Sequence, residues 1–379
     1  MSQAPSICVA HVCTVCALTL VAVAQSAPVI LRVGHVGHDH HTALYVAADC
    51  SKQWSTEDGA RLERVQDRKR YNLYLGSRHL AELELARVGG GAKMPTALAQ
   101  GAIDIGLGGT APVLAACDKG APIRLIAPLH NKGDVFVVNP DFPASSWSEF
   151  VAVSQATKRP IRIGYKSPMA CAKVIFEGAL RHAGLRFSSD PRETDAQIHL
   201  VNLKGGSKLN ASLAAGLVSG YVGNNPFPAI GEEKGILKAI CDLEALPPGD
   251  FLNHPCCCVA AGTDAIREKA AAIEVVLGLL LNATVQINRD LPGTAAIAAR
   301  WIGTTPAVEL KSLPTSGYSL AANDSWHRTM GIWIQHMNAL GILKKELKGL
   351  DETAVAKRAY DLSMLGRAVL NAQTGRAED

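Results

Sequence analysis

Short runs of apolar and β-branched residues alternate with segments of helical spacing along most of the chain. The run at residues 29–36 is typical of a buried parallel strand, and residues 42–55 have the periodicity of a helix. Further strands are expected at residues 83–88, 103–107, 123–129, 135–138, 161–165, 199–203, 218–222 and 256–261. Helices are expected at residues 93–100, 112–118, 145–156, 170–183 and 208–215, and the chain is almost wholly helical from residue 264. This alternation predicts open, parallel-rich sheets with right-handed crossovers.

The alternation falls into two sets, which predicts an α/β protein of two lobes with helices flanking both sheets and a helical C-terminal part. We expect lobe 1 to contain residues 29–131 with 265–379, and lobe 2 to contain residues 132–264. The strand at residues 256–261 is expected to return to the first lobe. A turn is expected at residues 131–133, between two strands. The charged segment 58–70 is expected to be an exposed excursion.

The N-terminal segment has the pattern of a targeting sequence. Residues 7–24 form an apolar run that ends in Ala22-Val23-Ala24, which resembles the core and cleavage site of a secretory signal peptide. Residues 1–24 are therefore predicted to be a signal peptide. A non-cleaved membrane anchor is the alternative, because residues 1–6 hold no Lys or Arg and the run borders on membrane-spanning length. Both interpretations predict a periplasmic or other extracytoplasmic protein, membrane-tethered in the second case.

Polar residues gather where the predicted strands end. In open α/β sheets, ligands bind outside the carboxyl ends of the strands. Four such ends lie at residues 37–41, 108–110, 166–167 and 223–226. If they meet at one cleft between the lobes, the candidate ligand-binding residues are His38, His41, Gly109, Thr110, Lys166, Ser167, Asn224 and Asn225.

The end at residues 108–110 reads Gly-Gly-Thr and leads into a helix. A turn of this kind exposes backbone N–H groups and a hydroxyl, which suits a small polar or anionic ligand. It contains no nucleophile and no acid. The pattern therefore favours holding a molecule over converting it.

Composition excludes some classes of function. The formal net charge is +4, and Arg68-Lys69-Arg70 is the longest basic run. Aromatic residues make up 5% of the chain, too few for a base-stacking surface. We therefore expect no nucleic-acid partner. Seven cysteines follow the predicted leader, an odd number whose spacing matches no disulfide framework or zinc ribbon.

From residue 31 to about residue 361 the chain resembles the periplasmic substrate-binding proteins of ABC importers. The resembling group includes the nitrate, bicarbonate, aliphatic-sulfonate and thiamine-precursor binding proteins. The segments that carry the likeness include VGHVGHDHHTALYVA, ALAQGAIDIGLGGTAPVLAACDKGAPIRLIA, RIGYKSPMACAKVIFEGALRHAGL and GYVGNNPFPAIGEEKG. The resemblance implies a two-lobe fold of the type II periplasmic-binding-protein kind, which closes on a solute and then docks on a membrane permease. It implies no catalysis and no cofactor, and we expect a monomer.

The same resemblance assigns several site residues. It matches His41, Ser167 and the segment 109–111 (Gly109, Thr110 and Ala111) to ligand-facing positions of the family. It also matches Asn225-Pro226 to a turn where many members carry an acid before proline. Because Asn224 and Asn225 supply no carboxylate there, we expect an anionic or heteroaromatic solute.

Two unusual clusters leave alternatives open. The segment His35–His41 suggests a metal-binding protein, with His38, His40 and His41 as candidate ligands. Adjacent residues point apart, however, and the histidines can equally contact solute or serve structure. The run Cys256-Cys257-Cys258 is expected on a strand, with Cys256 and Cys258 on one face and Cys257 on the other. Such a run also resembles the iron-linked cysteines of the hydroxymethylpyrimidine-phosphate synthases of thiamine biosynthesis, which is the enzymatic alternative.

Overall fold

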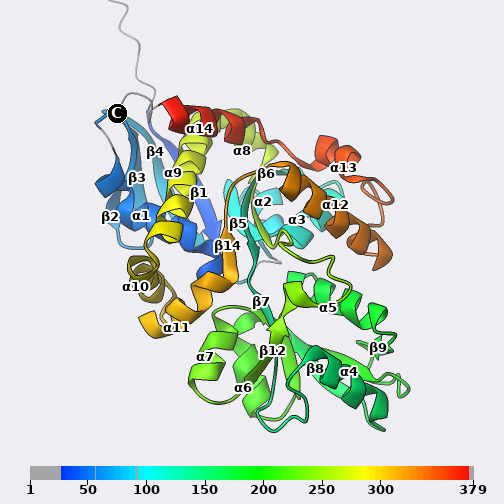
Figure 1. Cartoon of the computed structure of the whole chain (residues 1–379). Helices are drawn as coiled ribbons and strands as arrows, with labels where there is room; N and C mark the ends of the chain where they lie inside the picture. Colours follow the sequence, from blue (N-terminus) through cyan, green and yellow to red (C-terminus); the bar gives the residue numbers. More distant parts are fainter. Residues whose placement is uncertain (1–26, 56, 91–92, 375–379) are drawn as a thin grey trace, which may run out of the picture.

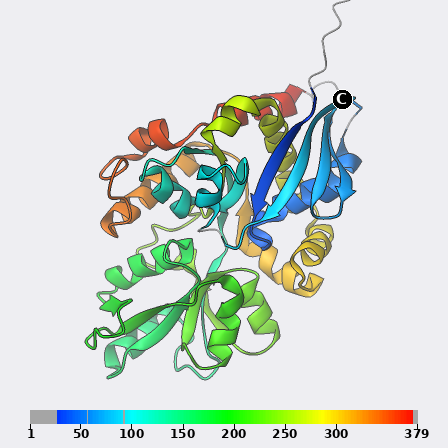
Figure 2. The same cartoon turned by 180° about the vertical axis from the view of Figure 1, so that it is seen from behind.

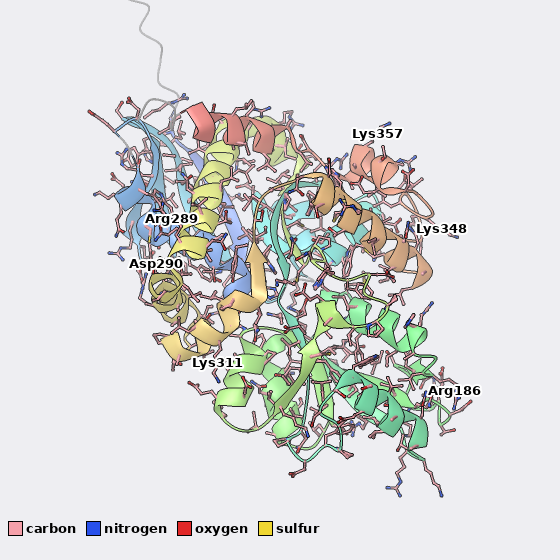
Figure 3. All side chains as sticks on the ribbon, in the orientation of Figure 1. Arg186, Arg289, Asp290, Lys311, Lys348 and Lys357 are labelled. Atoms are coloured by element: carbon pink, nitrogen blue, oxygen red, sulfur yellow. The ribbon has the colours of Figure 1, made fainter. Side chains whose placement is uncertain are left out.

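The computed structural model describes residues 27–55, 57–90 and 93–374, and the predicted signal peptide at residues 1–24 lies outside these ranges. Two lobes are visible, each built around one sheet (Figure 1). The blue, cyan and yellow-to-red segments form the larger lobe, and the green segments form the smaller one (Figure 2). Charged side chains such as Arg186, Lys311 and Lys348 lie at the periphery (Figure 3).

The larger lobe is built on an eight-stranded sheet with the strand order β14-β6-β13-β5-β1-β4-β3-β2. Its strands are β1 (Val29–His35), β2 (Ala60–Gln66), β3 (Arg70–Leu75), β4 (Arg78–Arg87), β5 (Ile105–Gly109), β6 (Ile123–Lys132), β13 (Cys257–Gly262) and β14 (Ser316–Tyr318). Strand β1 is parallel to β4 and β5, whereas β13 is antiparallel to β5 and β6. The parallel centre has the apolar character predicted for it, with Leu31 and Val33 fully buried.

Two expectations for this lobe are wrong. The charged segment 58–70 contains β2 and the start of β3, which extend the sheet instead of leaving it. Leu62, Tyr71 and Leu73 are buried, while the charged residues between them face solvent. These edge strands therefore have only one buried face, and their many charged residues hid the alternation of apolar and polar positions. Strand β13 pairs in the larger sheet, which confirms the predicted return to the first lobe, so the predicted end of lobe 2 at residue 264 lies too late in the chain. The other lobe boundaries stay a prediction.

The smaller lobe is built on a six-stranded sheet with the strand order β12-β7-β11-β8-β10-β9. Its strands are β7 (Asp134–Val138), β8 (Ile161–Tyr165), β9 (Phe187–Ser188), β10 (Ile198–Asn202), β11 (Gly220–Asn224) and β12 (Lys238–Asp242). Strands β8, β10 and β11 run parallel, and β7 pairs antiparallel with β11 and β12. The carboxyl ends of β8 and β11 therefore lie at the same edge of the sheet.

Helices cover both sheets (Figures 1 and 2). The helices before β13 are α1 (Thr42–Trp54), α2 (Met94–Ala99), α3 (Thr110–Cys117), α4 (Trp147–Ala156), α5 (Cys171–His182), α6 (Leu209–Ala214) and α7 (Phe227–Glu233). Those after it are α8 (Thr263–Glu268), α9 (Ala270–Arg289), α10 (Leu291–Ile302), α11 (Pro306–Ser312), α12 (Asp324–Ala339), α13 (Glu352–Ala359) and α14 (Ser363–Thr374). Within the described ranges, α9 alone is long and apolar enough to cross a membrane by length and composition. It packs against α1 and α14, and half of its apolar window is buried.

The chain first passes between the sheets at Gly133, which joins β6 to β7. The turn expected at residues 131–133 does not form, because Asn131 and Lys132 continue β6 and pair with β14. Gly133 has a φ of +87°, a conformation that favours glycine. A Cβ atom there would lie 2.8 Å from His40 Nε2. This crossing point therefore lies directly against the β1–α1 connection.

A buried carboxylate fastens the C-terminal part to the larger lobe. Asp118 follows α3 and accepts hydrogen bonds from the backbone N–H groups of Lys344 (2.9 Å), Lys345 (3.0 Å) and Leu347 (2.9 Å). Burial alone would raise the pKa of Asp118, but these backbone hydrogen bonds outweigh it and hold the pKa below its usual value. The segment after α12 is thus held by one side chain from the N-terminal half of the chain.

Candidate functional site

A small cavity of about 30 Å³ lies in the cleft where three of the predicted strand ends meet. His38 and His41 line it from the β1–α1 connection, and Gly109 lines it from the end of β5. Lys166 and Ser167 line it from the end of β8 in the other sheet. The structure therefore brings these five predicted residues together and places them on both sides of the cleft.

The histidines of the β1–α1 connection differ in role. This connection is a short 3-10 helix, η1 (Asp39–His41), and its side chains are buried. His41 Nδ1 accepts a hydrogen bond of 3.0 Å from the N–H of Val36, so this ring fixes the end of β1. Burial first, and His41 and His40 next, lower the pKa of His38 well below its usual value, so His38 is a neutral imidazole.

The segment 108–110 does not form the free turn that we expected. Strand β5 continues through Gly109, and α3 begins at Thr110 directly after it. The N–H of Thr110 donates to the carbonyl of Cys256 at 2.9 Å and is not free for a ligand. Thr110 and Ala111 are almost fully buried and do not line the cavity. Strand pairing with the segment that leads into β13 explains the difference, because it uses the donor that the sequence pattern left open.

The strand end at residues 223–226 does not line the cavity itself but contacts Lys166, which does. Lys166 Nζ donates to Asn224 Oδ1, and Asn224 Nδ2 donates to the carbonyl of Asn225 at 2.6 Å. Asn225 Nδ2 in turn donates to Thr315 Oγ1 at 2.9 Å. Both asparagines are buried, and neither lines the cavity. Asn224 therefore orients the cleft lysine.

The floor of the cleft holds a cluster of side chains that the sequence pattern does not predict. His40, His130, Cys256 and Cys257 are all buried, and their potential ligand atoms all lie within 4.8 Å of one another. We call these four residues the floor cluster. His40 Nδ1 lies 3.6 Å from Cys256 Sγ and 3.9 Å from Cys257 Sγ, and the rings of His40 and His130 are 4.1 Å apart. Among the described residues, the clusters able to hold an ion include His40, but neither His38 nor His41.

The orientation of the cysteines corrects our prediction for this run. Cys256 precedes β13, which begins at Cys257, so strict alternation of faces does not apply to this pair. The register against β6 also shifts between Cys257 and Cys258. Cys256 and Cys257 therefore share the floor cluster, whereas Cys258 pairs opposite Gly108 and is not part of it.

A carboxylate adjoins the floor cluster from the smaller lobe. Asp134 Oδ2, at the start of β7, lies 3.3 Å from Cys256 Sγ and 3.6 Å from His254 Nε2. Burial would raise the pKa of Asp134, but His254, His40 and Lys166 lower it, so Asp134 is ionised. The hydrogen bond from Cys256, together with the imidazoles of His130 and His40, lowers the pKa of Cys257 well below its usual value. The neighbouring imidazoles therefore favour the thiolate form of Cys257, whereas burial raises the pKa of Cys256.

The missed residues had little sequence signal. His130, Asp134 and His254 lie far along the chain from His40 and join no local motif. The cysteine run was visible, but its partners come from β6 and from the segment before β13. A second hollow of about 580 Å³ lies on the surface between α1, β2 and α10. It contains none of the predicted strand ends.

Two mixed sheets that meet at a cleft lined by residues of both lobes are characteristic of the two-lobe periplasmic-binding-protein fold. The solved structures that share it include the ligand-binding component of an ABC-type import system from Staphylococcus aureus with zinc bound. That structure matches with a TM-score of 0.68 at 14% identity, over 90% of this chain and 99% of that chain. The chain belongs to the NMT1-like family, whose model matches residues 31–303, more than half of the sequence.

Two further structures show the same fold. The nitrate-binding protein NrtA from Synechocystis PCC 6803 matches with a TM-score of 0.69 at 10% identity, over 91% of this chain and 89% of that chain. The alkanesulfonate-binding protein SsuA from Xanthomonas axonopodis pv. citri, bound to MOPS, matches with a TM-score of 0.64 at 17% identity, over 88% and 99%. The uncharacterized protein MJ1180 of Methanocaldococcus jannaschii is 34% identical over 103 residues, 27% of this chain and 71% of that protein. The predicted fold class and the resemblance to nitrate- and sulfonate-type binding proteins are confirmed.

Proposed function

We propose that this protein is the extracytoplasmic solute-binding component of an ABC importer. It binds one small solute in the cleft between its lobes and delivers it, as a monomer, to a membrane permease. Its family and its structural neighbours, which are binding components of importers, support this assignment. The observation that carries it is the cavity, which is lined by His38 and Gly109 of one lobe and by Lys166 and Ser167 of the other.

Residues from both lobes give a physical reason for closure. A solute that contacts both walls is bound more tightly in the closed arrangement than in an open one, and it can shift the equilibrium by that difference in affinity. The crossing at Gly133 lies next to the cavity, so a small change in backbone angle there moves one wall against the other. The protein holds its solute and does not convert it.

The test is a ligand screen with two measurements. Thermal unfolding of the purified protein is followed with nitrate, bicarbonate, alkanesulfonates, pyrimidines and transition-metal ions, and small-angle scattering is recorded with each. A true solute at 100 times its Kd adds about 2.7 kcal/mol to the free energy of unfolding. The same solute should reduce the radius of gyration. If none of these solutes stabilises the protein or compacts it, the proposal is wrong.

A variant at the cleft makes the test specific. Lys166→Met removes a cation that lines the cavity, whereas Lys158→Met removes an exposed lysine elsewhere on the same lobe. We expect Lys166→Met to change the affinity for the solute at least tenfold, and Lys158→Met to leave it unchanged. The direction also reports the solute's charge, because loss of a cation weakens the binding of an anion. The anionic or heteroaromatic class stays a prediction until then.

A further inference from the structure

The floor cluster is an unusual set of side chains for a protein interior. Buried cysteines ordinarily pack as small apolar groups. Here Cys256 and Cys257 instead face two imidazoles and lie beside the carboxylate of Asp134. A buried polar group without a partner costs free energy, and within the described part of the chain His130 Nε2 is such a group, so the arrangement favours a ligand that pairs with this nitrogen as well as with the thiols.

We propose that the floor cluster binds one thiophilic transition-metal cation of the Zn²⁺ class, with Cys256, Cys257, His40 and His130 as its four ligands. Two thiolates and two imidazoles form a donor set that Zn²⁺ takes in tetrahedral sites. Zn–S bonds of about 2.3 Å and Zn–N bonds of about 2.0–2.1 Å imply S···N separations of about 3.6 Å in a tetrahedron. The observed separations from His40 Nδ1 are 3.6 Å to Cys256 Sγ and 3.9 Å to Cys257 Sγ. The thiols and His40 are therefore spaced for an ion.

The outer hydrogen bonds select the ring nitrogens that would bind. His40 Nε2 lies 3.2 Å from the carbonyl of Gly133, which requires the proton on Nε2 and leaves the Nδ1 lone pair facing the thiols. His130 Nδ1 lies 3.1 Å from the carbonyl of Asn131, which requires the proton on Nδ1. The remaining nitrogen, His130 Nε2, is buried and has no hydrogen-bond partner among the described residues. Backbone carbonyls that fix a ligating imidazole in this way are typical of metal sites.

The cavity lies directly against the floor cluster. His40, Cys256 and Cys257 line it from the larger lobe, and Lys166 and Ser167 line it from the opposite wall.

If the proposed function holds, the bound cation is the transported solute or part of it; this one consequence rests on the proposed function. Binding at the floor cluster itself depends only on the four side chains. Three of them come from the larger lobe's β6 and from the segment at the start of β13, and His40 comes from the β1–α1 connection. Asp134 and Lys166 approach the cluster from the smaller lobe.

The experiment measures metal binding directly. The protein is stripped with a chelator under reducing conditions and titrated with Zn²⁺ against a chromophoric competitor. A parallel titration with Co²⁺ follows the thiolate-to-cobalt charge-transfer absorption. We expect one ion per chain and an absorption intensity that corresponds to two thiolates.

Variants assign the site. Cys256→Ser and Cys257→Ser should each weaken Zn²⁺ binding at least about 100-fold, more than the loss of an outer partner, and should halve the charge-transfer intensity. Cys258→Ser is the matched control, because Cys258 is the next residue and equally buried but lies outside the floor cluster. His130→Ala should weaken binding without loss of charge-transfer bands. Circular dichroism and urea unfolding of each variant separate loss of ligand from loss of fold.

The outcomes separate this inference from the proposed function. No stoichiometric Zn²⁺ binding, or an equal loss in Cys258→Ser, overturns the inference. If an organic or anionic solute then compacts the protein, the proposed function stands without it. Binding of Zn²⁺ at the floor cluster with no compaction by any solute supports the inference and contradicts the proposed function.

Discussion

Replacing Asp118 by Ala should destabilise the protein more than any ordinary helix-cap substitution. The Asp118 carboxylate accepts hydrogen bonds from three backbone N–H groups, those of Lys344, Lys345 and Leu347. Asp118 is 1% exposed. The substitution removes all three bonds and leaves donors in a part-buried segment without their acceptor.

The expected magnitude follows from the number and kind of these bonds. A hydrogen bond to a charged group contributes about 1.5–3 kcal/mol, and bonds to one acceptor are not additive. We therefore expect Asp118→Ala to lower the free energy of unfolding by about 3–5 kcal/mol at pH 7. Asp351→Ala is the control, because Asp351 caps α13 through a single, exposed bond to the N–H of Ala354. Its expected cost is about 1 kcal/mol.

Urea unfolding at pH 7 and at pH 3 measures both effects. Because the pKa of Asp118 is lowered in the folded protein, its ionisation stabilises the fold above the pKa of the unfolded chain. That contribution is lost as the pH falls through the folded pKa, so the difference between wild type and Asp118→Ala should shrink at pH 3. Equal losses in Asp118→Ala and Asp351→Ala at pH 7 would refute the reasoning, and so would a difference that grows in acid.

Two further substitutions test the crossing point and a buried acid. Gly133→Ala places a Cβ atom 2.8 Å from His40 Nε2 at a φ of +87°, whereas Gly120→Ala has a similar φ of +79° and nothing within 4 Å. Both should lose about 1–2 kcal/mol in urea unfolding from backbone strain. Gly133→Ala should lose more than Gly120→Ala, because its Cβ atom also meets Ser316 Oγ and His40 Nε2. Gly133→Ala alone should weaken Zn²⁺ binding in the competition assay; equal Zn²⁺ affinities of the two variants would contradict this. Burial first, and Asp39 next, raise the pKa of Glu309 to about 8, so its proton stabilises the fold less and less as the pH rises toward 8. In wild type this lowers the free energy of unfolding by up to about 1.4 kcal/mol per pH unit, and Glu309→Gln should remove that pH dependence. Urea unfolding from pH 5 to 8 measures it, and the same slope of unfolding free energy against pH in both proteins would exclude the raised pKa.

Much of the scaffold could be predicted because its central strands are continuous apolar runs. The strand expected at residues 161–165 coincides with β8, whose alternate residues Ile161 and Ile163 are buried. The hairpin of β2 and β3 was missed because charged residues on its solvent face outnumber the few inward ones. The hydrophobic pattern therefore identifies a strand buried on both faces more reliably than an edge strand buried on one face.

The candidate site was predictable only in part, for a different reason. Strand ends could be located from the sequence, and His38, Gly109, Lys166 and Ser167, predicted at three of these ends, line the cavity. Contacts across the cleft could not be located, because they depend on how two sheets meet. The hydrogen bond between Lys166 and Asn224 could not be read from their spacing of 58 residues. The floor cluster depends in addition on a register shift in β13 that no local pattern encodes.

The central claim is that this protein binds its solute between the lobes at the carboxyl ends of the strands. A crystal structure of the complex with the most stabilising solute of the screen tests it most directly. Electron density for the solute should lie between the wall that carries His38 and Gly109 and the wall that carries Lys166 and Ser167, above or within the floor cluster. Density for the solute only in the surface hollow between α1, β2 and α10 would contradict the account.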